Sequence, residues 1–134
     1  MVDFVDSCGE FAGKVWRYLE QEGPQTENDL IKKSGLNNNE FFCAVGWLAK
    51  ENKIVKDDKK YFLGETNLTN KIGKDAGMVW NILDMWQEVD LKSISRLSKI
   101  NEDEVFFAVG WLAREDKING KFQIKKEKYL FWLK

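Results

Sequence analysis

Two stretches of the chain are nearly identical: Ala44-Val45-Gly46-Trp47-Leu48-Ala49-Lys50-Glu51-Asn52-Lys53-Ile54 and Ala108-Val109-Gly110-Trp111-Leu112-Ala113-Arg114-Glu115-Asp116-Lys117-Ile118. The first begins at residue 44 and the second at residue 108, an offset of 64 residues. At this offset the match continues upstream without a gap to Gly13 and Gly77. Such a match at a fixed offset is the signature of an internal repeat. The chain is therefore a tandem duplication.

Each repeat has the pattern of three helices followed by a β-hairpin. In the first repeat, apolar residues at helical spacing predict a helix over 11–21, which Gly23 and Pro24 end. The same reasoning predicts helices over 27–33, 38–51, 74–87, 91–97 and 102–116, and strands over 54–56 and 60–63. In the second repeat Asn119-Gly120 predicts the turn of the hairpin. We therefore expect an α+β fold of two tandem winged helix-turn-helix domains.

The repeated stretch also carries a family resemblance. It resembles the hallmark of a winged helix-turn-helix family of bacterial and archaeal proteins without an assigned function, in which it closes the third helix. Many members of that family have a single copy, whereas this chain has two. The resemblance implies the fold and a loose association with transcription regulators, and it supplies no ligand. We expect a first domain over 1–64, a linker over 65–73 and a second domain over 74–134.

The composition argues against an enzyme. The 134 residues are 43% hydrophobic with a net charge of −1, which suits a packed core, and they include no histidine, the commonest general base and metal ligand. Cys8 and Cys43 form no CxxC pair, so we expect reduced thiols, no metal and no cofactor. No apolar run is long enough to span a membrane, and the first residues are acidic rather than basic as in a secretory signal. We expect a cytoplasmic, non-catalytic protein.

Aromatic residues on the outward half of the third helices predict an interaction surface, because exposed apolar patches mark interfaces. Gly46 and Gly110 directly precede Trp47 and Trp111 in the sequence, and a glycine there permits another helix or chain to approach closely. Three alternatives remain open: the tryptophans pack inside their own domains, they form a seam that replaces a homodimer interface, or they bind an external partner. Trp86 and Trp132 have no counterpart in the first repeat and are expected at the junction or in the core. The candidate interface residues are Phe42, Cys43, Trp47, Trp86, Phe106, Phe107, Trp111 and Trp132.

A helix-turn-helix reads DNA with the first residues of its third helix. Asn side chains at this place in the first repeat suit adenine edges, whereas Glu102, Asp103 and Glu104 in the second repeat meet phosphates of like charge. A chain of slightly acidic balance does not favour reading of the major groove by both repeats. Its scattered lysines are typical of a solvated surface. The alternative interpretation is that lysines of the wings contact the phosphates of the DNA backbone. The candidate nucleic-acid contacts are Asn38, Asn39, Lys59, Lys60, Lys92, Arg96, Lys99, Lys121, Lys125 and Lys126.

The sequence therefore favours a binding protein over an enzyme. Our interpretation is a transcription- or chromatin-associated adaptor that acts mainly through protein contacts, with a protein partner or with itself. The alternative is a DNA-binding transcriptional regulator that uses the wing lysines and the first turn of the third helix.

Overall fold

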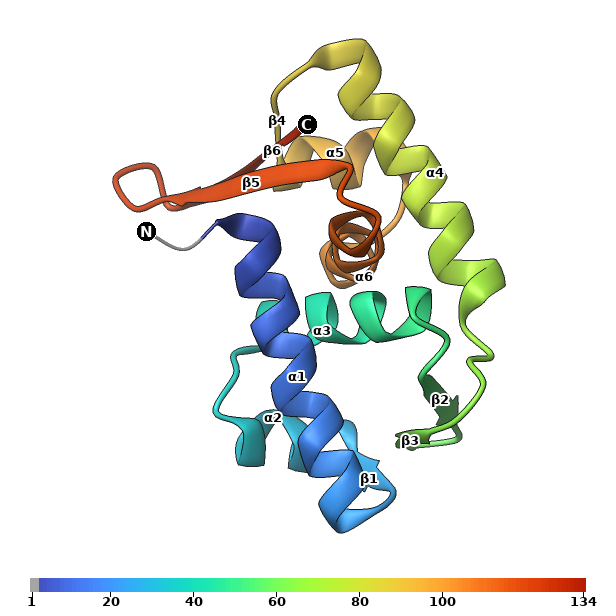
Figure 1. Cartoon of the computed structure of the whole chain (residues 1–134). Coiled ribbons are helices and arrows are strands. Elements are labelled where there is room, and N and C mark those ends of the chain that lie inside the picture. Colours follow the sequence, from blue (N-terminus) through green and yellow to red (C-terminus); the bar gives the residue numbers. More distant parts are fainter. Residues whose placement is uncertain (1–2) are drawn as a thin grey trace.

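The chain forms two winged helix-turn-helix units in tandem (Figure 1). The structure is a computed structural model that describes residues 3–134, so that Met1 and Val2, at the start of the expected first domain, lie outside the described residues. Each unit has three helices and a three-stranded antiparallel sheet. The predicted α+β class and the tandem arrangement are confirmed.

The two units have the same order of elements. The first contains α1 (Phe4–Glu22), β1 (Gln25–Thr26), α2 (Glu27–Ser34), α3 (Asn38–Lys50), β2 (Ile54–Asp57) and β3 (Lys60–Leu63). The second contains α4 (Thr69–Trp86), β4 (Val89–Asp90), α5 (Leu91–Ser98), α6 (Glu102–Arg114), β5 (Ile118–Gln123) and β6 (Lys128–Leu133). The strand orders are β1-β3-β2 and β4-β6-β5, so a two-residue strand that the sequence did not reveal completes each sheet.

Local signals fix several helix ends. Helix α1 ends at Gly23, whose φ of 74° suits glycine. The Thr26 hydroxyl caps α2 by accepting a hydrogen bond from the Asp29 N–H at 3.2 Å. Helix α3 begins with a capping box in which the side chains of Asn37 and Glu40 each accept a hydrogen bond from the other's backbone N–H. Asn101 and Glu104 form the same box on α6.

Both first helices begin earlier than predicted. Helix α1 starts at Phe4 rather than at residue 11, because the Asp3 side chain caps it and Phe4 and Cys8 continue its apolar face. Helix α4 starts at Thr69, inside the expected linker. Its first turn is polar and lacks a side-chain cap, so only Ile72 could have revealed it.

The predicted Asn-Gly turn is wrong. Asn119 and Gly120 lie within β5, opposite Trp132 and Phe131, and the hairpin turns at residues 124–127. A Cβ on Gly120 would come within 2.8 Å of the Phe131 ring and 3.1 Å of the Phe4 ring. Glycine is therefore needed there for the close approach of α1 to the sheet rather than for a turn.

A single hydrophobic core runs through both units. Its fully buried side chains include Val15 and Phe41 from the first unit and Val79 and Phe106 from the second. Helices α3 and α6 lie next to each other at the centre of the molecule, and the N-terminal end of α1 lies beneath β5 (Figure 1). Because small domains bury little surface alone, this shared core stabilises both units.

Candidate functional site

The third helices of the two units pack against each other at a pair of glycines. A Cβ on Gly46 would overlap the carbonyl oxygen of Phe107, and a Cβ on Gly110 would overlap the carbonyl oxygen of Cys43. The two contacts are equivalent, because Phe107 and Gly110 are the counterparts of Cys43 and Gly46. Backbones approach this closely only where a side chain is absent. We call this contact between α3 and α6 the seam.

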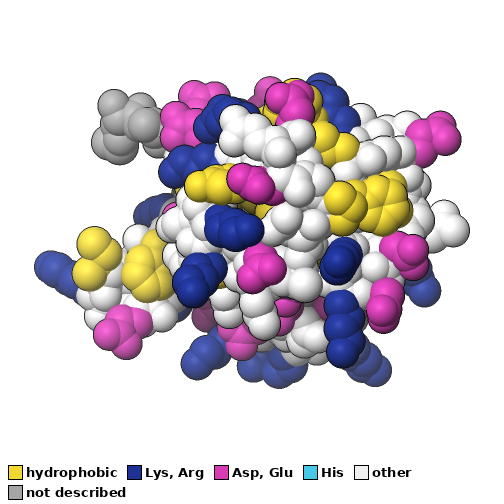
Figure 2. Space-filling view, turned by 90° about the horizontal axis from the view of Figure 1, so that it is seen from below, with side chains coloured by type: hydrophobic (Ala, Val, Ile, Leu, Met, Phe, Trp, Pro, Cys, Tyr) yellow, Lys and Arg dark blue, Asp and Glu magenta, His cyan; other side chains and the backbone are white. Residues whose placement is uncertain are grey.

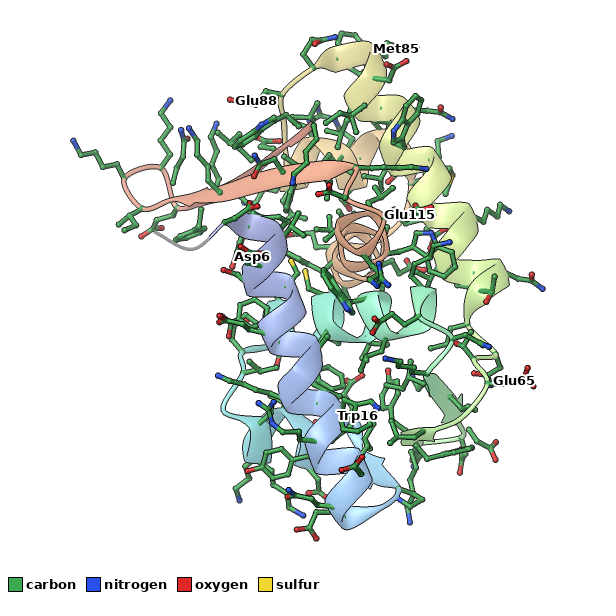
Figure 3. The ribbon with its side chains drawn as sticks, in the orientation of Figure 1. Asp6, Trp16, Glu65, Met85, Glu88 and Glu115 are labelled. Carbon is green, nitrogen blue, oxygen red and sulfur yellow. The ribbon has the colours of Figure 1, made fainter. Side chains whose placement is uncertain are left out.

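Charged and aromatic side chains extend the seam with the same reciprocity. Arg114 Nε donates to Glu51 at 3.0 Å, and Lys50 pairs with Glu115 at 3.7 Å (Glu115 is labelled in Figure 3). The Lys50 ammonium lies 5.1 Å from the ring centre of Trp111, and the Arg114 guanidinium lies 5.8 Å from that of Trp47. These are cation–π contacts across the seam.

Each of these tryptophans also packs on the first helix of its own unit. A Cβ on Gly9 of α1 would lie 3.2 Å from the Trp47 ring, and a Cβ on Gly73 of α4 would lie 3.3 Å from the Trp111 ring. Trp47 and Trp111 therefore lie between the first helix of one unit and a basic side chain of the other. They pack beside the seam rather than under the wings.

The remaining third-helix candidates divide between the seam and the core. The rings of Phe42 and Phe107 meet across the seam with centroids 4.9 Å apart. Phe106 lies in the core of the second unit, with its ring 5.0 Å from Tyr129 and 6.0 Å from Phe131. The Cys43 thiol is buried, and a hydrogen bond with the Cys8 thiol together with burial raises its pKa well above the ordinary value. It is protonated at neutral pH.

Trp86 and Trp132 do not form the junction. Trp86 is 58% exposed at the C-terminal end of α4, and it lines a pocket whose other residues all belong to the second unit. Trp132 alternates with Phe131 along β6, so it faces away from the side on which Phe131 contacts Phe4 of the first unit. The sequence left the junction and the core open for these two tryptophans, and the contact between the third helices forms at Gly46 and Gly110 instead.

The pocket beside Trp86 was not predicted. It measures about 510 Å³, with Trp86, Val89, Leu97 and Leu130 as apolar walls and charged residues around them: Glu88, Asp90, Arg96, Lys126 and Lys128. Nearby, Met85 is 73% exposed, and Leu97 is 44% exposed (Figure 3 labels Met85 and Glu88). The first repeat has Gln21, Glu22 and Lys33 at the positions of Met85, Trp86 and Leu97, and this difference between the repeats was the available signal.

The nucleic-acid candidates do not gather into one basic surface. Lys59 and Lys60 lie at the β2–β3 hairpin, Lys92 and Arg96 on α5 with Lys99 at its end, and Lys121, Lys125 and Lys126 on the β5–β6 hairpin. Asn39, Lys92 and Lys126 line one pocket, but Asp90, Glu102 and Glu127 line it too. Asn38 is exposed at the start of α3. Figure 2 shows basic and acidic side chains interspersed over one face of the molecule.

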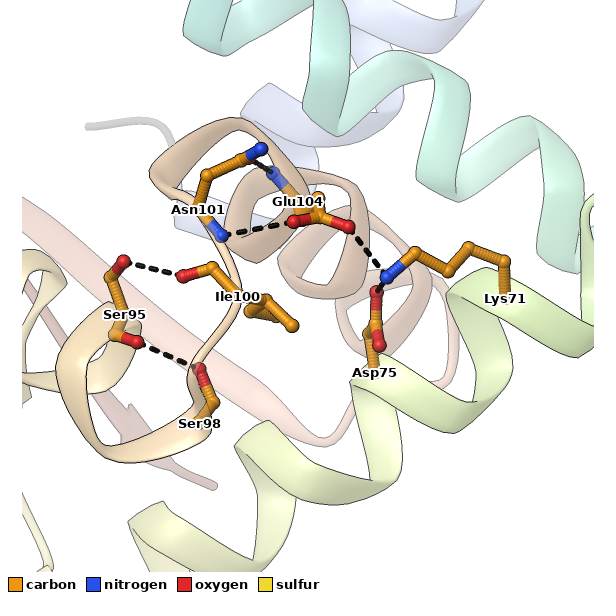
Figure 4. Close-up of polar contacts among 7 residues, drawn as sticks. All are labelled: Lys71, Asp75, Ser95, Ser98, Ile100, Asn101 and Glu104. Carbon is orange, nitrogen blue, oxygen red and sulfur yellow. Dashed lines mark hydrogen bonds and ion pairs between the residues drawn. The ribbon is translucent and has the colours of Figure 1, made fainter.

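An ion cluster joins α4 to α6 (Figure 4). Lys71 Nζ lies 2.6 Å from Asp75 and 2.5 Å from Glu104, and the Asp75 side chain is almost fully buried. Hydrogen bonds to Asp75 and Glu104 raise the pKa of Lys71. The hydrogen bond from Lys71, reinforced by the Asn101 N–H, lowers the pKa of Glu104. Lys71 and Glu104 are therefore both charged at neutral pH.

Within residues 3–134, no group of three or more His, Cys, Asp or Glu side chains could hold a metal ion. None of the helices in this part of the chain combines the length and apolar character needed to cross a membrane.

Comparison with known proteins identifies the family. A family described as "Winged helix-turn-helix domain (DUF2582)" matches the chain twice, at residues 4–63 and 67–133. The chain belongs to this family. An uncharacterized protein of Methanocaldococcus jannaschii is 39% identical over 67 residues, which cover 47% of this chain and 96% of that protein. That relative is thus about as long as one repeat. No solved structure matches the chain significantly.

Proposed function

We propose that this member of the winged helix-turn-helix family is a non-catalytic, transcription- or chromatin-associated adaptor that acts through protein contacts. The observation that carries the proposal is the seam. A helix-turn-helix reads DNA by inserting its third helix into the major groove. Here the central faces of α3 and α6 are covered by each other, from Phe42 and Phe107 to the pairs Lys50–Glu115 and Arg114–Glu51. Neither helix presents that face to DNA.

The surface for a protein partner is the pocket beside Trp86. An exposed tryptophan flanked by Met85 and Leu97 supplies the aromatic and aliphatic anchors that dominate protein interfaces. Glu88 and Arg96 contribute charges of both signs to the rim, which suits a partner with its own mixed charges. The first unit has polar residues at the equivalent positions, so the proposed surface belongs to the second unit alone.

A photo-crosslinking amino acid tests this surface. We expect it at position 86 to capture a discrete protein in cells of the native host. The same substitution at Glu22, the exposed counterpart in the first repeat, serves as the matched control and should capture none. Equal capture from both positions, or capture only of nucleic acid from position 86, would contradict the adaptor.

One observation favours DNA as a second candidate. The β5–β6 hairpin projects from the body of the molecule (Figure 1), and it carries Lys121, Lys125, Lys126 and Lys128. Phosphate contacts from such a wing need no helix in the major groove. They would be independent of base sequence and strongly weakened by salt.

Titration of fluorescent duplex DNA separates the two functions. For the adaptor we expect no binding tighter than about 10 μM at roughly 0.15 M salt. Micromolar or tighter binding with a steep salt dependence would favour the wing. A double variant, Lys125→Gln with Lys126→Gln, would then have to weaken that binding, whereas the control pair Lys14→Gln with Lys74→Gln on the first helices should not.

A further inference from the structure

A small apolar cavity lies where the second wing meets the first unit, away from the pocket beside Trp86. It measures about 160 Å³, is lined by residues of α1, α3, α6 and the β5–β6 hairpin, and opens to solvent on one side, where Phe122 is 48% exposed. The walls are five aromatic side chains and both cysteines: Phe4, Phe11, Phe106, Phe122, Tyr129, Cys8 and Cys43. We propose that this cavity is a binding site for a neutral aromatic molecule of about the size of phenol or indole.

The size and the lining define the ligand class. A space of about 150 Å³ between apolar side chains is large enough for a molecule of benzene size. Aromatic walls such as Phe106 and Tyr129 favour an aromatic guest through edge and offset contacts. The remaining lining residues are polar or charged and suit one O–H or N–H group on the ligand: Ser7, Asn39, Glu40 and Lys121.

The repeat shows that the cavity is specific to one side of the molecule. At the equivalent places of the other side, Ile72 replaces Cys8 and Phe107 replaces Cys43. Phe107 fills its space by packing on Phe42. The counterpart of Phe11 is Asp75, which belongs to the ion cluster with Lys71. The cavity therefore exists because two small side chains stand where the second repeat has large ones.

The second wing forms one wall of the cavity. Its strands β5 and β6 are six residues long, whereas β2 and β3 have four, and Phe122 packs on Tyr129 with ring centroids 4.8 Å apart. Burial raises the pKa of Tyr129, which keeps its hydroxyl neutral beside Asn39 of α3. An unfilled apolar cavity costs stability. A ligand that contacts both units there would stabilise their association.

Binding is tested with phenol and indole as probes and cyclohexanol as a non-aromatic control of similar size. For the full chain we expect saturable binding of phenol or indole, a higher Tm in their presence, and amide chemical-shift changes that include residues 8, 43 and 129. Cyclohexanol should bind more weakly. Absence of saturable binding by both aromatic probes, or shift changes confined to other residues, would overturn the proposal.

The second repeat supplies the filling variant. Cys43→Phe copies Phe107 and should pack on Phe106 as Phe107 packs on Phe42, so affinity should fall at least about tenfold. Ile72→Val on the opposite side is the matched control and should leave affinity unchanged. If Cys43→Phe does not fold, Cys8→Val replaces it with a smaller addition of volume. Unchanged affinity in a folded filling variant would also overturn the proposal.

Discussion

At the scale of single residues, Lys71 shows how the two repeats have diverged. Its ammonium lies between Asp75 on the same helix and Glu104 on α6, and Asp75 is only 3% exposed. A buried carboxylate is tolerated when a charged partner compensates it. In the first repeat Phe11 and Ser7 replace Asp75 and Lys71, so the same place beside the seam is apolar. An ion cluster therefore joins α4 to α6 in the second repeat, whereas the equivalent place in the first repeat borders the apolar cavity.

This difference predicts a pH-dependent contribution from Glu104. Because Lys71 lowers the pKa of Glu104, the carboxylate stabilises the fold above its unfolded pKa, and this contribution is lost as the pH falls through its folded pKa. We expect Glu104→Gln to reduce the free energy of unfolding by up to about 1 kcal/mol at neutral pH, since the pair is partly exposed. Near about pH 3 the difference should shrink. Urea denaturation at both pH values measures it.

Glu40→Gln is the matched control for that experiment. Glu40 and Glu104 both accept a hydrogen bond in a capping box, and glutamine retains this role. The Lys71 ion pair is made by Glu104. A loss of stability in Glu104→Gln that equals the loss in Glu40→Gln at both pH values would show that the ion pair contributes nothing.

At the scale of elements, the crossing of α3 and α6 depends on two missing side chains. We expect Gly46→Ala to destabilise the protein by at least about 1–3 kcal/mol, because the new methyl group would overlap the Phe107 carbonyl and force the helices apart. Thermal or urea denaturation followed by circular dichroism measures the loss. Gly110→Ala should behave alike, since its methyl group would meet the Cys43 carbonyl.

Gly77→Ala provides the control, because it also replaces a glycine inside a helix. Gly77 is exposed on α4, and nothing lies within 4 Å of the added Cβ. Alanine should therefore stabilise α4 by about 0.5–1 kcal/mol through its helix propensity. A neutral or stabilising result for Gly46→Ala would mean that the helices do not cross at this glycine.

The elements also show where reading of the sequence reached its limit. Caps and helical spacing located the third helices closely, since these signals are local. The sequence did not predict the start of α4, because that helix lacks a side-chain cap. It did not predict the role of Gly120 either, because that role depends on a contact with Phe4, far away in the chain. The outward aromatic residues left three alternatives open: packing within each domain, a seam between the repeats, or an external partner. Only long-range packing distinguishes these, and the exposed pocket beside Trp86 had no motif.

At the scale of the whole molecule, the seam has the geometry of a homodimer interface within one chain. The glycine contacts, the ion pairs and the cation–π contacts of α3 on α6 are matched by those of the counterpart residues, as in Lys50–Glu115 and Glu51–Arg114. Such reciprocity is the property of a two-fold interface. The relative from Methanocaldococcus jannaschii, about as long as one repeat, fits an ancestor in which two separate chains met in this way.

This reciprocity predicts that the second repeat alone, residues 67–134, associates with itself. In a symmetric pair Gly110 would meet the Phe107 backbone, and Arg114 would meet Glu115 and Trp111, which repeats the contacts that Lys50 makes in the full chain. We expect a dimer in sedimentation equilibrium, with a Tm that rises with protein concentration. Gly110→Arg in the fragment is the control and should abolish both effects, because a large charged side chain cannot fit between the helices. A fragment that stays folded and monomeric at all concentrations would show that the seam is not self-complementary.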